Sequence, residues 1–155
     1  MTRIETVSIV YQAPMILLGM KKKKFGTGRY NGFGGGVNDG EGLERCAIRE
    51  TEEEAGITII NPERIGRILF QFEVNEQNHL VYFFRTTTFN GVLKESDEMK
   101  PEWFHKENIP YEQMWPDDKY WLPLLLEGKK FRGDFYFDSQ LKIAKHELRE
   151  VDKID

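Results

Sequence analysis

Residues Gly35–Ile57 read GGVNDGEGLERCAIRETEEEAGI, and this stretch decides the fold. It opens on glycines, and apolar side chains then recur at helical spacing at Leu43, Cys46 and Ala47. Gly56 follows at the position where a left-handed helix cap is expected. The pattern therefore predicts a glycine-rich loop that runs into one helix, and this helix ends just before Gly56.

The apolar stripe of this helix continues into three carboxylates, Glu50, Glu53 and Glu54. Like charges that close repel one another by about 1 kcal/mol per pair or more, depending on the local dielectric. A divalent cation among them would offset this repulsion, and hard carboxylate oxygens suit Mg²⁺ or Mn²⁺. A solvated helix end is the competing interpretation, because glutamate is a good helix former and runs of glutamate are common.

The residues around the carboxylates favour the metal interpretation. Gly34–Gly36 and Gly40 allow backbone conformations and close approaches that a side chain would block. Arg49 is adjacent to Glu50 and can reach Glu41 in the loop. A guanidinium placed there would orient a carboxylate rather than only solvate it.

The stretch resembles the motif of the Nudix (MutT-type) hydrolases, which is Gly, five residues, Glu, seven residues, Arg-Glu, an apolar residue, any residue, Glu-Glu, any residue, Gly and an apolar residue. The residues that match this motif are Gly35, Glu41, Arg49, Glu50, Glu53, Glu54, Gly56 and Ile57. Thr51 is the one departure, because the family has an aliphatic residue there. We expect Thr51 to point away from the carboxylates and to affect packing rather than chemistry.

The resemblance implies both a fold and a metal-assisted hydrolysis. The expected fold class is α/β (α+β), a Nudix α/β/α sandwich with a mixed β-sheet, in a single domain over residues 1–155. The residues that it assigns to catalysis are Arg49, Glu50, Glu53 and Glu54. The residues that it assigns to Mg²⁺, with Mn²⁺ as a substitute, are Gly35, Glu50, Glu53, Glu54 and Glu98. A carboxylate not committed to the metal would act as the base, and the products would be a nucleoside monophosphate and pyrophosphate.

The composition describes an ordinary soluble protein. The chain has 155 residues, of which 39% are hydrophobic and 31% charged, and this suits one domain with a sizeable core. A net charge of −4 provides no global basic field for a nucleic-acid polymer. The first segment, Met1–Met20, is interrupted by Glu5, Gln12 and Pro14, so it predicts neither a signal peptide nor a membrane span.

The single cysteine, Cys46, excludes an internal disulfide framework and fits a reducing compartment. We expect it to pack within the helix, because no histidine is placed by the sequence to activate it as a catalytic thiol. The chain is therefore expected to be cytoplasmic, and we expect it to act as a monomer without a membrane partner.

The rest of the chain carries strand signals around a second helix. Runs rich in Phe, Val, Ile and Thr, or bounded by turn residues, predict strands at Ile4–Tyr11, Met15–Met20, Ile65–Val74, Leu80–Thr88, Pro101–Phe104, Phe131–Phe137 and Lys142–Val151. A loop is expected over Lys21–Tyr30. Pro116 and Asp117 suit the first turn of a helix, which predicts a second helix that runs to Glu127.

Two further segments bear on the substrate, and each has two interpretations. The run Lys21–Lys24 is either a solvated loop or an attraction for a polyphosphate in a mostly acidic protein. The run Met114–Asp118 is either a capped helix start with a packed Trp, or a nucleobase site with a stacking indole and two carboxyls on the base edge. Residue types alone leave both pairs of alternatives open.

Nearly the full length resembles one Nudix subfamily, the animal oxidised-purine nucleoside triphosphatases, which remove 8-oxo-dGTP and 2-hydroxy-dATP from the nucleotide pool before they damage DNA. The runs that carry this resemblance are Leu17–Lys22, Asn31–Gly35, Glu95–Met99, Met114–Asp118, Pro123–Leu126 and Leu148–Asp152. The resemblance implies that the purine edge contacts Asn31, Asp117 and Asp118. It implies that the pocket is lined by Thr6, Lys21, Phe25, Phe70, Met99 and Trp115.

Two positions depart from the subfamily, and two rival functions remain. Tyr30 stands where the subfamily has Trp, and Gly36 where it has Lys, so the differences bear on the preferred oxidised base and not on the reaction class. The nearer rival is a Nudix hydrolase of ADP-ribose or a dinucleoside polyphosphate. The other rival is a non-catalytic module that binds nucleotides or RNA ends, and the intact glutamate set argues against it.

Overall fold

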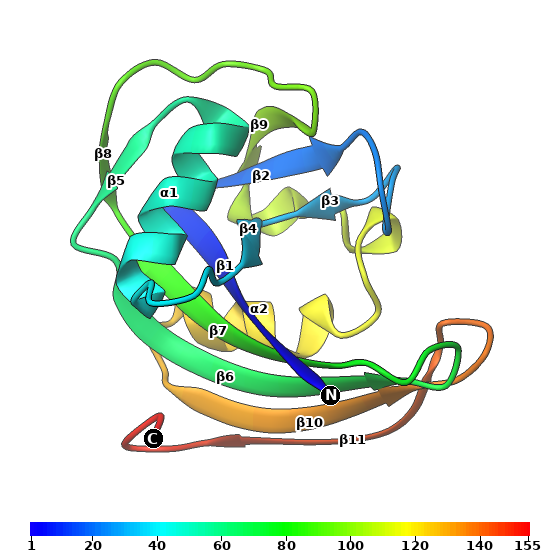
Figure 1. Cartoon of the computed structure of the whole chain (residues 1–155). Coiled ribbons are helices and arrows are strands. Elements are labelled where there is room, and N and C mark those ends of the chain that lie inside the picture. The colour runs from blue at the N-terminus through cyan, green and yellow to red at the C-terminus, as the bar shows by residue number, and fades with distance from the viewer.

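The computed structural model describes residues 1–155. The protein contains a nine-stranded mixed sheet (Figure 1). The strands of this sheet are β1 (Thr2–Gln12), β2 (Met15–Lys21), β3 (Tyr30–Asn31), β4 (Phe33–Gly36), β6 (Glu63–Phe72), β7 (Asn78–Thr86), β9 (Met99–His105), β10 (Phe131–Phe137) and β11 (Ile143–Glu150). Their order is β11-β10-β6-β7-β1-β2-β3, while β4 pairs with β1 and β9 pairs with β2. The pairs β1–β7 and β6–β10 are parallel and the other pairs are antiparallel, so the sheet is mixed as expected.

Helices and short elements complete the chain. The two α-helices are α1 (Leu43–Ala55) and α2 (Asp118–Leu126). A separate two-stranded sheet joins β5 (Thr58–Ile60) to β8 (Thr88–Asn90), and two 3₁₀ turns cover Lys106–Asn108 and Tyr111–Gln113. None of the helices combines the length and the apolar character that a membrane crossing requires.

The alternation of side chains along the strands creates two cores, one under each helix. Consecutive residues of a strand point to opposite faces of its sheet. Thus Ile9 packs with Trp121 and the rest of the α2 face, whereas the next residue, Val10, packs with Ala47 and the rest of the α1 face. The same division separates Phe83 from its neighbour Phe84. The two helices therefore cover opposite faces of the sheet, which confirms the expected sandwich (Figure 1).

Most of the predicted elements are confirmed, with ends that differ by a few residues. The predicted pair Ile65–Val74 and Leu80–Thr88 corresponds to the antiparallel strands β6 and β7. The strand expected over Lys142–Val151 is β11, and the second helix begins and ends close to its predicted bounds. The short strands β3, β5 and β8 were not predicted.

The predicted glycine-rich loop is wrong at its start, because residues 33–36 form the strand β4. Strand β1 pairs with β4 through residues 5–8 and then with β2 through residues 10–12. The close approach needs glycine: a Cβ on Gly34 would lie 1.7 Å from the backbone oxygen of Thr6. Glycine has a low propensity for strands, so local sequence could not predict a strand that its partner imposes.

Candidate active site

Helix α1 brings the motif to one end of a cavity. It begins after Gly42 and ends at Gly56, whose φ of 75° is left-handed and whose N–H donates to the carbonyl of Glu52. The expected cap is therefore present. Cys46 is buried against Thr6, at 3.3 Å from Sγ to Oγ1, and burial raises the pKa of this thiol. It packs the helix on β1, as predicted.

Thr51 is also buried in α1, where its hydroxyl donates to the carbonyl of Ala47 at 2.8 Å. This contact satisfies the polar group that replaces the aliphatic residue of the motif. The departure at Thr51 thus changes packing within the helix, as predicted.

Arg49 ties the loop to the helix through the contacts that its spacing predicted. Its Nε and Nη2 donate to the two carboxylate oxygens of Glu41 at 2.7 and 2.9 Å, and its Nη1 donates to Glu50 at 2.8 Å. Nη2 also donates to the carbonyl of Gly36 at 3.1 Å. The Arg49 guanidinium lowers the pKa of Glu41 to about 2, so Glu41 stays charged and keeps both hydrogen bonds from Arg49.

The three motif carboxylates have different environments. Glu54 is 4% exposed, accepts from the N–H of Gly34 at 2.8 Å, and has its pKa raised to about 8 by burial. Burial also raises the pKa of Glu50, whose side chain is 14% exposed. Glu53 is 58% exposed, so the prediction that the core-facing stripe of the helix continues through all three carboxylates is wrong for Glu53. It lies at the edge of the buried stripe, where Arg49 reaches it at 3.3 Å.

The donors around α1 suit a divalent cation, although they do not converge in this structure. No group of three or more acidic, histidine or cysteine side chains gathers at metal-binding distance. Arg49 engages Glu50, and Gly34 engages Glu54. The absence of a side chain on Gly35 leaves space beside Glu50, because a Cβ there would lie 2.5 Å from the Glu50 carboxyl carbon. After burial, the charges of Glu50 and Glu98 further raise the pKa of Glu54, which is the repulsion that a cation would offset.

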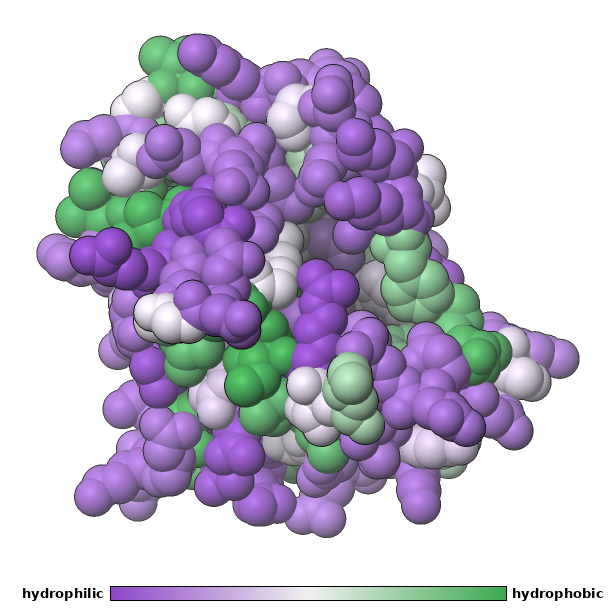
Figure 2. Space-filling view, in the orientation of Figure 1, coloured by the Kyte–Doolittle hydropathy of each residue, from purple (hydrophilic) through white to green (hydrophobic).

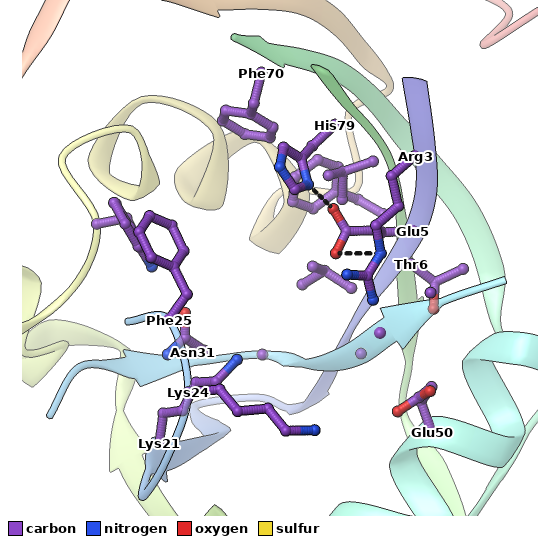
Figure 3. Close-up of a pocket in the computed structure, with 18 of the residues that line it drawn as sticks. Arg3, Glu5, Thr6, Lys21, Lys24, Phe25, Asn31, Glu50, Phe70 and His79 are labelled. Carbon is purple, nitrogen blue, oxygen red and sulfur yellow. Dashed lines mark hydrogen bonds and ion pairs between the residues drawn. The ribbon is translucent and has the colours of Figure 1, made fainter. Parts of the chain in front are cut away.

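A single cavity of about 520 Å³ connects this helix to the other half of the predicted site. Figure 2 shows the surface hollowed beside the helix, and Figure 3 shows the cavity walls. The predicted site residues that line it are Thr6, Lys21, Phe25, Asn31, Gly35, Glu50, Glu53, Glu54, Phe70, Glu98, Met99, Trp115, Asp117 and Asp118. Among the predicted residues only Arg49 does not line the cavity. Its guanidinium donates a hydrogen bond to Glu50, which does line it.

The far end of the cavity holds the two adjacent aspartates. Asp117 and Asp118 are 4% and 6% exposed, and Asp117 accepts from Nε1 of Trp121 at 2.7 Å. Burial raises the pKa of both carboxyls, and the neighbouring charge of Asp117 raises that of Asp118 further. The pair is thus suited to retain a proton that an exposed aspartate would lose, and a protonated carboxyl can donate to a ligand. Nearby, Asn31 donates to the carbonyl of Arg29, which fixes the direction of its amide.

An aromatic wall flanks the aspartates. Trp115 is half-buried, with Phe25 at 5.2 Å between ring centroids and the guanidinium of Arg29 at 4.4 Å from its ring. Phe72 and Phe137 stack on each other at 5.1 Å, and each forms a T-shaped contact with the indole. Sequence reasoning missed these two residues, since they meet only through the parallel pairing of β6 and β10.

A polar cluster on the wall formed by β1 and β7 was also missed. It consists of Arg3, Glu5 and His79, which the parallel register places together (Figure 3). Nδ1 of His79 contacts Glu5, and Nε of Arg3 lies 3.6 Å from the second oxygen of Glu5. No local pattern reveals the cluster, because His79 is more than 70 residues away in the chain from Arg3 and Glu5.

The predicted lysine run divides between the cavity and the loop surface. Lys21 and Lys24 line the cavity, whereas Lys22 and Lys23 do not. Lys22 donates to Glu95 at 2.7 Å and Lys24 to Glu98 at 3.2 Å. The run is therefore partly a surface loop and partly a source of positive charge at the cavity.

Comparison with known proteins agrees with this arrangement. A family model described as the NUDIX domain matches residues 1–125. The chain is 45% identical over 151 residues to the oxidized purine nucleoside triphosphate hydrolase of Mus musculus, covering 97% of each protein, and 43% identical to that of Danio rerio, covering 99% of this chain and 98% of the relative. A MutT protein from Bacillus halodurans superposes with a TM-score of 0.84 at 26% identity, covering 94% of this chain and 97% of that one. The matched motif, the fold and the near full-length similarity together establish that this chain belongs to the Nudix family.

Proposed function

We propose that this protein hydrolyses oxidised purine nucleoside triphosphates, of the 8-oxo-dGTP and 2-hydroxy-dATP type, to the monophosphate and pyrophosphate. The observation that carries the proposal is one continuous cavity with buried carboxyls and an aromatic wall at one end and the motif carboxylates at the other. The similarity to the mouse and zebrafish hydrolases over nearly the whole chain supports the same substrate class. Such an activity would remove damaged nucleotides from the pool.

The base would occupy the end that holds Trp115, Asp117 and Asp118. Stacking on an indole is worth about 1–3 kcal/mol per base and accepts any base, so it supplies affinity rather than selection. Selection would come from Asn31 and the aspartate pair, whose buried polar atoms would be left unpaired by a mismatched base edge. Lys21, Phe25, Phe70, Met99 and Thr6 would complete the walls of this pocket.

The triphosphate would extend toward α1, where a divalent metal belongs in the Nudix family. Mg²⁺, or Mn²⁺ in its place, would be held by Glu50, Glu53, Glu54, Glu98 and the carbonyl of Gly35. When bound, the metal supplies charge neutralisation at the transferring phosphorus and lowers the pKa of water. Arg49 would hold Glu50 in position from behind, and one of the carboxylates would accept the proton of the attacking water.

We infer that residues 1–155 form a single domain, since one sheet takes strands from both ends of the chain. The net charge of −4 argues against a nucleic-acid polymer as a partner. We place the protein in the cytoplasm as a monomer, where a reducing environment would keep Cys46 free.

Pyrophosphate release across a panel of nucleotides, with Mg²⁺ and after chelation, tests the proposal. We expect fast release from 8-oxo-dGTP or 2-hydroxy-dATP, slower release from dGTP, and no release from any of them after treatment with EDTA. Chelation should leave the circular dichroism spectrum unchanged, because the two cores do not depend on a metal. Preferred turnover of ADP-ribose or a dinucleoside polyphosphate would contradict the substrate class. Nucleotide binding without any turnover would contradict catalysis.

A further inference from the structure

The cluster of Arg3, Glu5 and His79 lies on a cavity wall between the two ends of the site. All three residues line the same cavity as Glu50 and Asp117. Arg3 and Glu5 are two residues apart on β1 and so share one face, and the parallel register sets His79 of β7 opposite Arg3. Figure 3 shows the three side chains grouped on the side of the cavity that faces Lys21 and Lys24.

The guanidinium of Arg3 lies beside Gly36, the last residue of strand β4, which precedes α1. A Cβ on Gly36 would lie 2.8 Å from Nη2 of Arg3, so a side chain at this position would compete with the guanidinium for space. On the preceding residue, Gly35, a Cβ would meet the carboxyl group of Glu50. Because Gly36 and Gly35 carry no side chain, Arg3 and Glu50 occupy adjacent positions along β4.

The contacts of Arg3 leave its outer nitrogens available. Nε lies 3.6 Å from Glu5, and Glu5 is held in turn by Nδ1 of His79. The side chain of Arg3 is 49% exposed, whereas those of Glu5 and His79 are only 21% and 20% exposed. The two less exposed residues therefore anchor one side of the guanidinium and direct its other side into the cavity.

The charge around this position indicates an anionic ligand. The α1 end of the cavity carries the carboxylates of Glu50, Glu53 and Glu54, which repel a phosphate chain unless cations intervene. Lys24 is already paired with Glu98 at 3.2 Å. A guanidinium presents a planar fork of N–H donors that matches two phosphate oxygens, and such charge-assisted bonds are about twice as strong as neutral ones.

We propose that Arg3, placed beside Gly36 and anchored by Glu5 and His79, binds the phosphate chain of the substrate on the wall opposite the lysines. The proposal rests on the proposed function, because it names the group that holds the triphosphate in that same site. Within the cluster, His79 adjoins the aromatic wall, because its ring meets that of Phe72 in a T-shaped contact at 5.6 Å. The guanidinium of Arg3 lies instead beside Gly36, on the strand that leads to α1, so Arg3 is the member placed toward the phosphate end of the site.

The test compares ligands with and without phosphates on matched variants. Arg3→Gln should raise KM for the oxidised purine triphosphate about tenfold and leave kcat within about threefold, because the lost bond is present in both the bound substrate and the transition state. Calorimetry should show a similar loss for inorganic tripolyphosphate at constant Mg²⁺. The affinity for 8-oxo-deoxyguanosine, which has no phosphate, should stay within about twofold.

Two further variants control for charge and for placement. Arg132→Gln makes the same change of charge on β10, away from the cavity lining, and should leave KM, kcat and both affinities unchanged. Gly36→Ala keeps Arg3 but displaces its guanidinium, so it should reproduce the loss for tripolyphosphate. Full tripolyphosphate affinity in both Arg3→Gln and Gly36→Ala, or an equal loss for tripolyphosphate and the nucleoside, would overturn the proposal. The tripolyphosphate measurement needs no turnover, so it separates this proposal from a failure of the proposed function.

Discussion

At the scale of single residues, neighbouring carboxylates of one helix have opposite environments. Glu53 and Glu54 are consecutive, and the helical rotation of about 100° between them turns one to solvent and the other into the protein. Glu54 keeps only the N–H of Gly34 as a hydrogen-bond donor, and burial raises its pKa to about 8. Burial destabilises the charged form of this carboxyl, and one hydrogen bond offsets little of that cost. A pKa perturbed in this way is expected of a functional group rather than a structural one.

Glu54→Gln should therefore remove activity without unfolding the protein. The amide keeps an oxygen for the N–H of Gly34 and removes the buried charge, so the melting temperature should be equal or higher. The loss of a metal ligand should lower kcat by roughly 10²-fold or more. Glu52→Gln is the matched control, because Glu52 is exposed on the same helix and its carboxylate accepts a hydrogen bond only from Thr58. A folded Glu54→Gln variant with wild-type turnover at saturating Mg²⁺ would show that the metal assignment is wrong.

The aspartate pair should make stability depend on pH in an unusual direction. Burial raises the pKa of Asp118 well above its ordinary value of 3.8, so above that pH the folded protein binds more protons than the unfolded chain. The stability from this group is fully present below the unfolded pKa and is lost as the pH rises through the folded pKa. Asp118→Asn cannot titrate, so its free energy of unfolding relative to the wild type should increase as the pH rises from the acid to the alkaline range. Urea titrations at several pH values measure this difference, and curves that stay parallel would contradict the raised pKa.

At the scale of elements, the strand β4 decides how closely α1 approaches the sheet. It pairs with the first half of β1, and its glycines leave no side chain between the strand and its neighbours. The geometry fixes the motif carboxylates relative to the cavity, since Glu54 bonds to Gly34 and Glu50 fills the space beside Gly35. Here the packing of one element on another is part of the site.

Gly34→Ala should consequently destabilise the protein more than an alanine elsewhere in the motif. Its Cβ would lie 1.7 Å from the backbone oxygen of Thr6, a contact that requires backbone movement, so we expect a loss of about 2 kcal/mol or more. Gly42→Ala is the control, because nothing lies within 4 Å of its Cβ position and its φ of −74° suits alanine. Chemical denaturation of both variants checks this, and equal stabilities would mean that β4 can move away from β1 at little cost.

The elements also differ in whether the amino-acid sequence can predict them. Helix α1 was predictable because its apolar spacing, its charges and Gly56 all lie within one local stretch. Strand β4 was not predictable, because its glycines form a strand only through pairing with β1. The same limit applies to the site: Trp115, Asp117 and Asp118 stand in one run, whereas Arg3 meets His79, and Phe72 meets Phe137, only through parallel strand pairing.

At the scale of the whole molecule, the cavity joins the two faces of the sheet. The α2 face supplies the aspartates and the aromatic wall, and the α1 face supplies the motif carboxylates. The base and the reacting phosphates of one substrate would therefore contact different layers of the sandwich. This separation predicts that base selection and catalysis can be altered independently.

The most direct test of this central claim is the effect of Asp117→Asn on the selectivity between 8-oxo-dGTP and dGTP. The asparagine oxygen can still accept from Nε1 of Trp121, so the fold should persist while the protons presented to the base change. We predict that kcat/KM for 8-oxo-dGTP falls at least roughly tenfold more than kcat/KM for dGTP, whereas Glu54→Gln lowers both values by the same factor. Equal losses on both nucleotides in Asp117→Asn would contradict the account, because Asp117 would then act in structure or catalysis and not in recognition of the base.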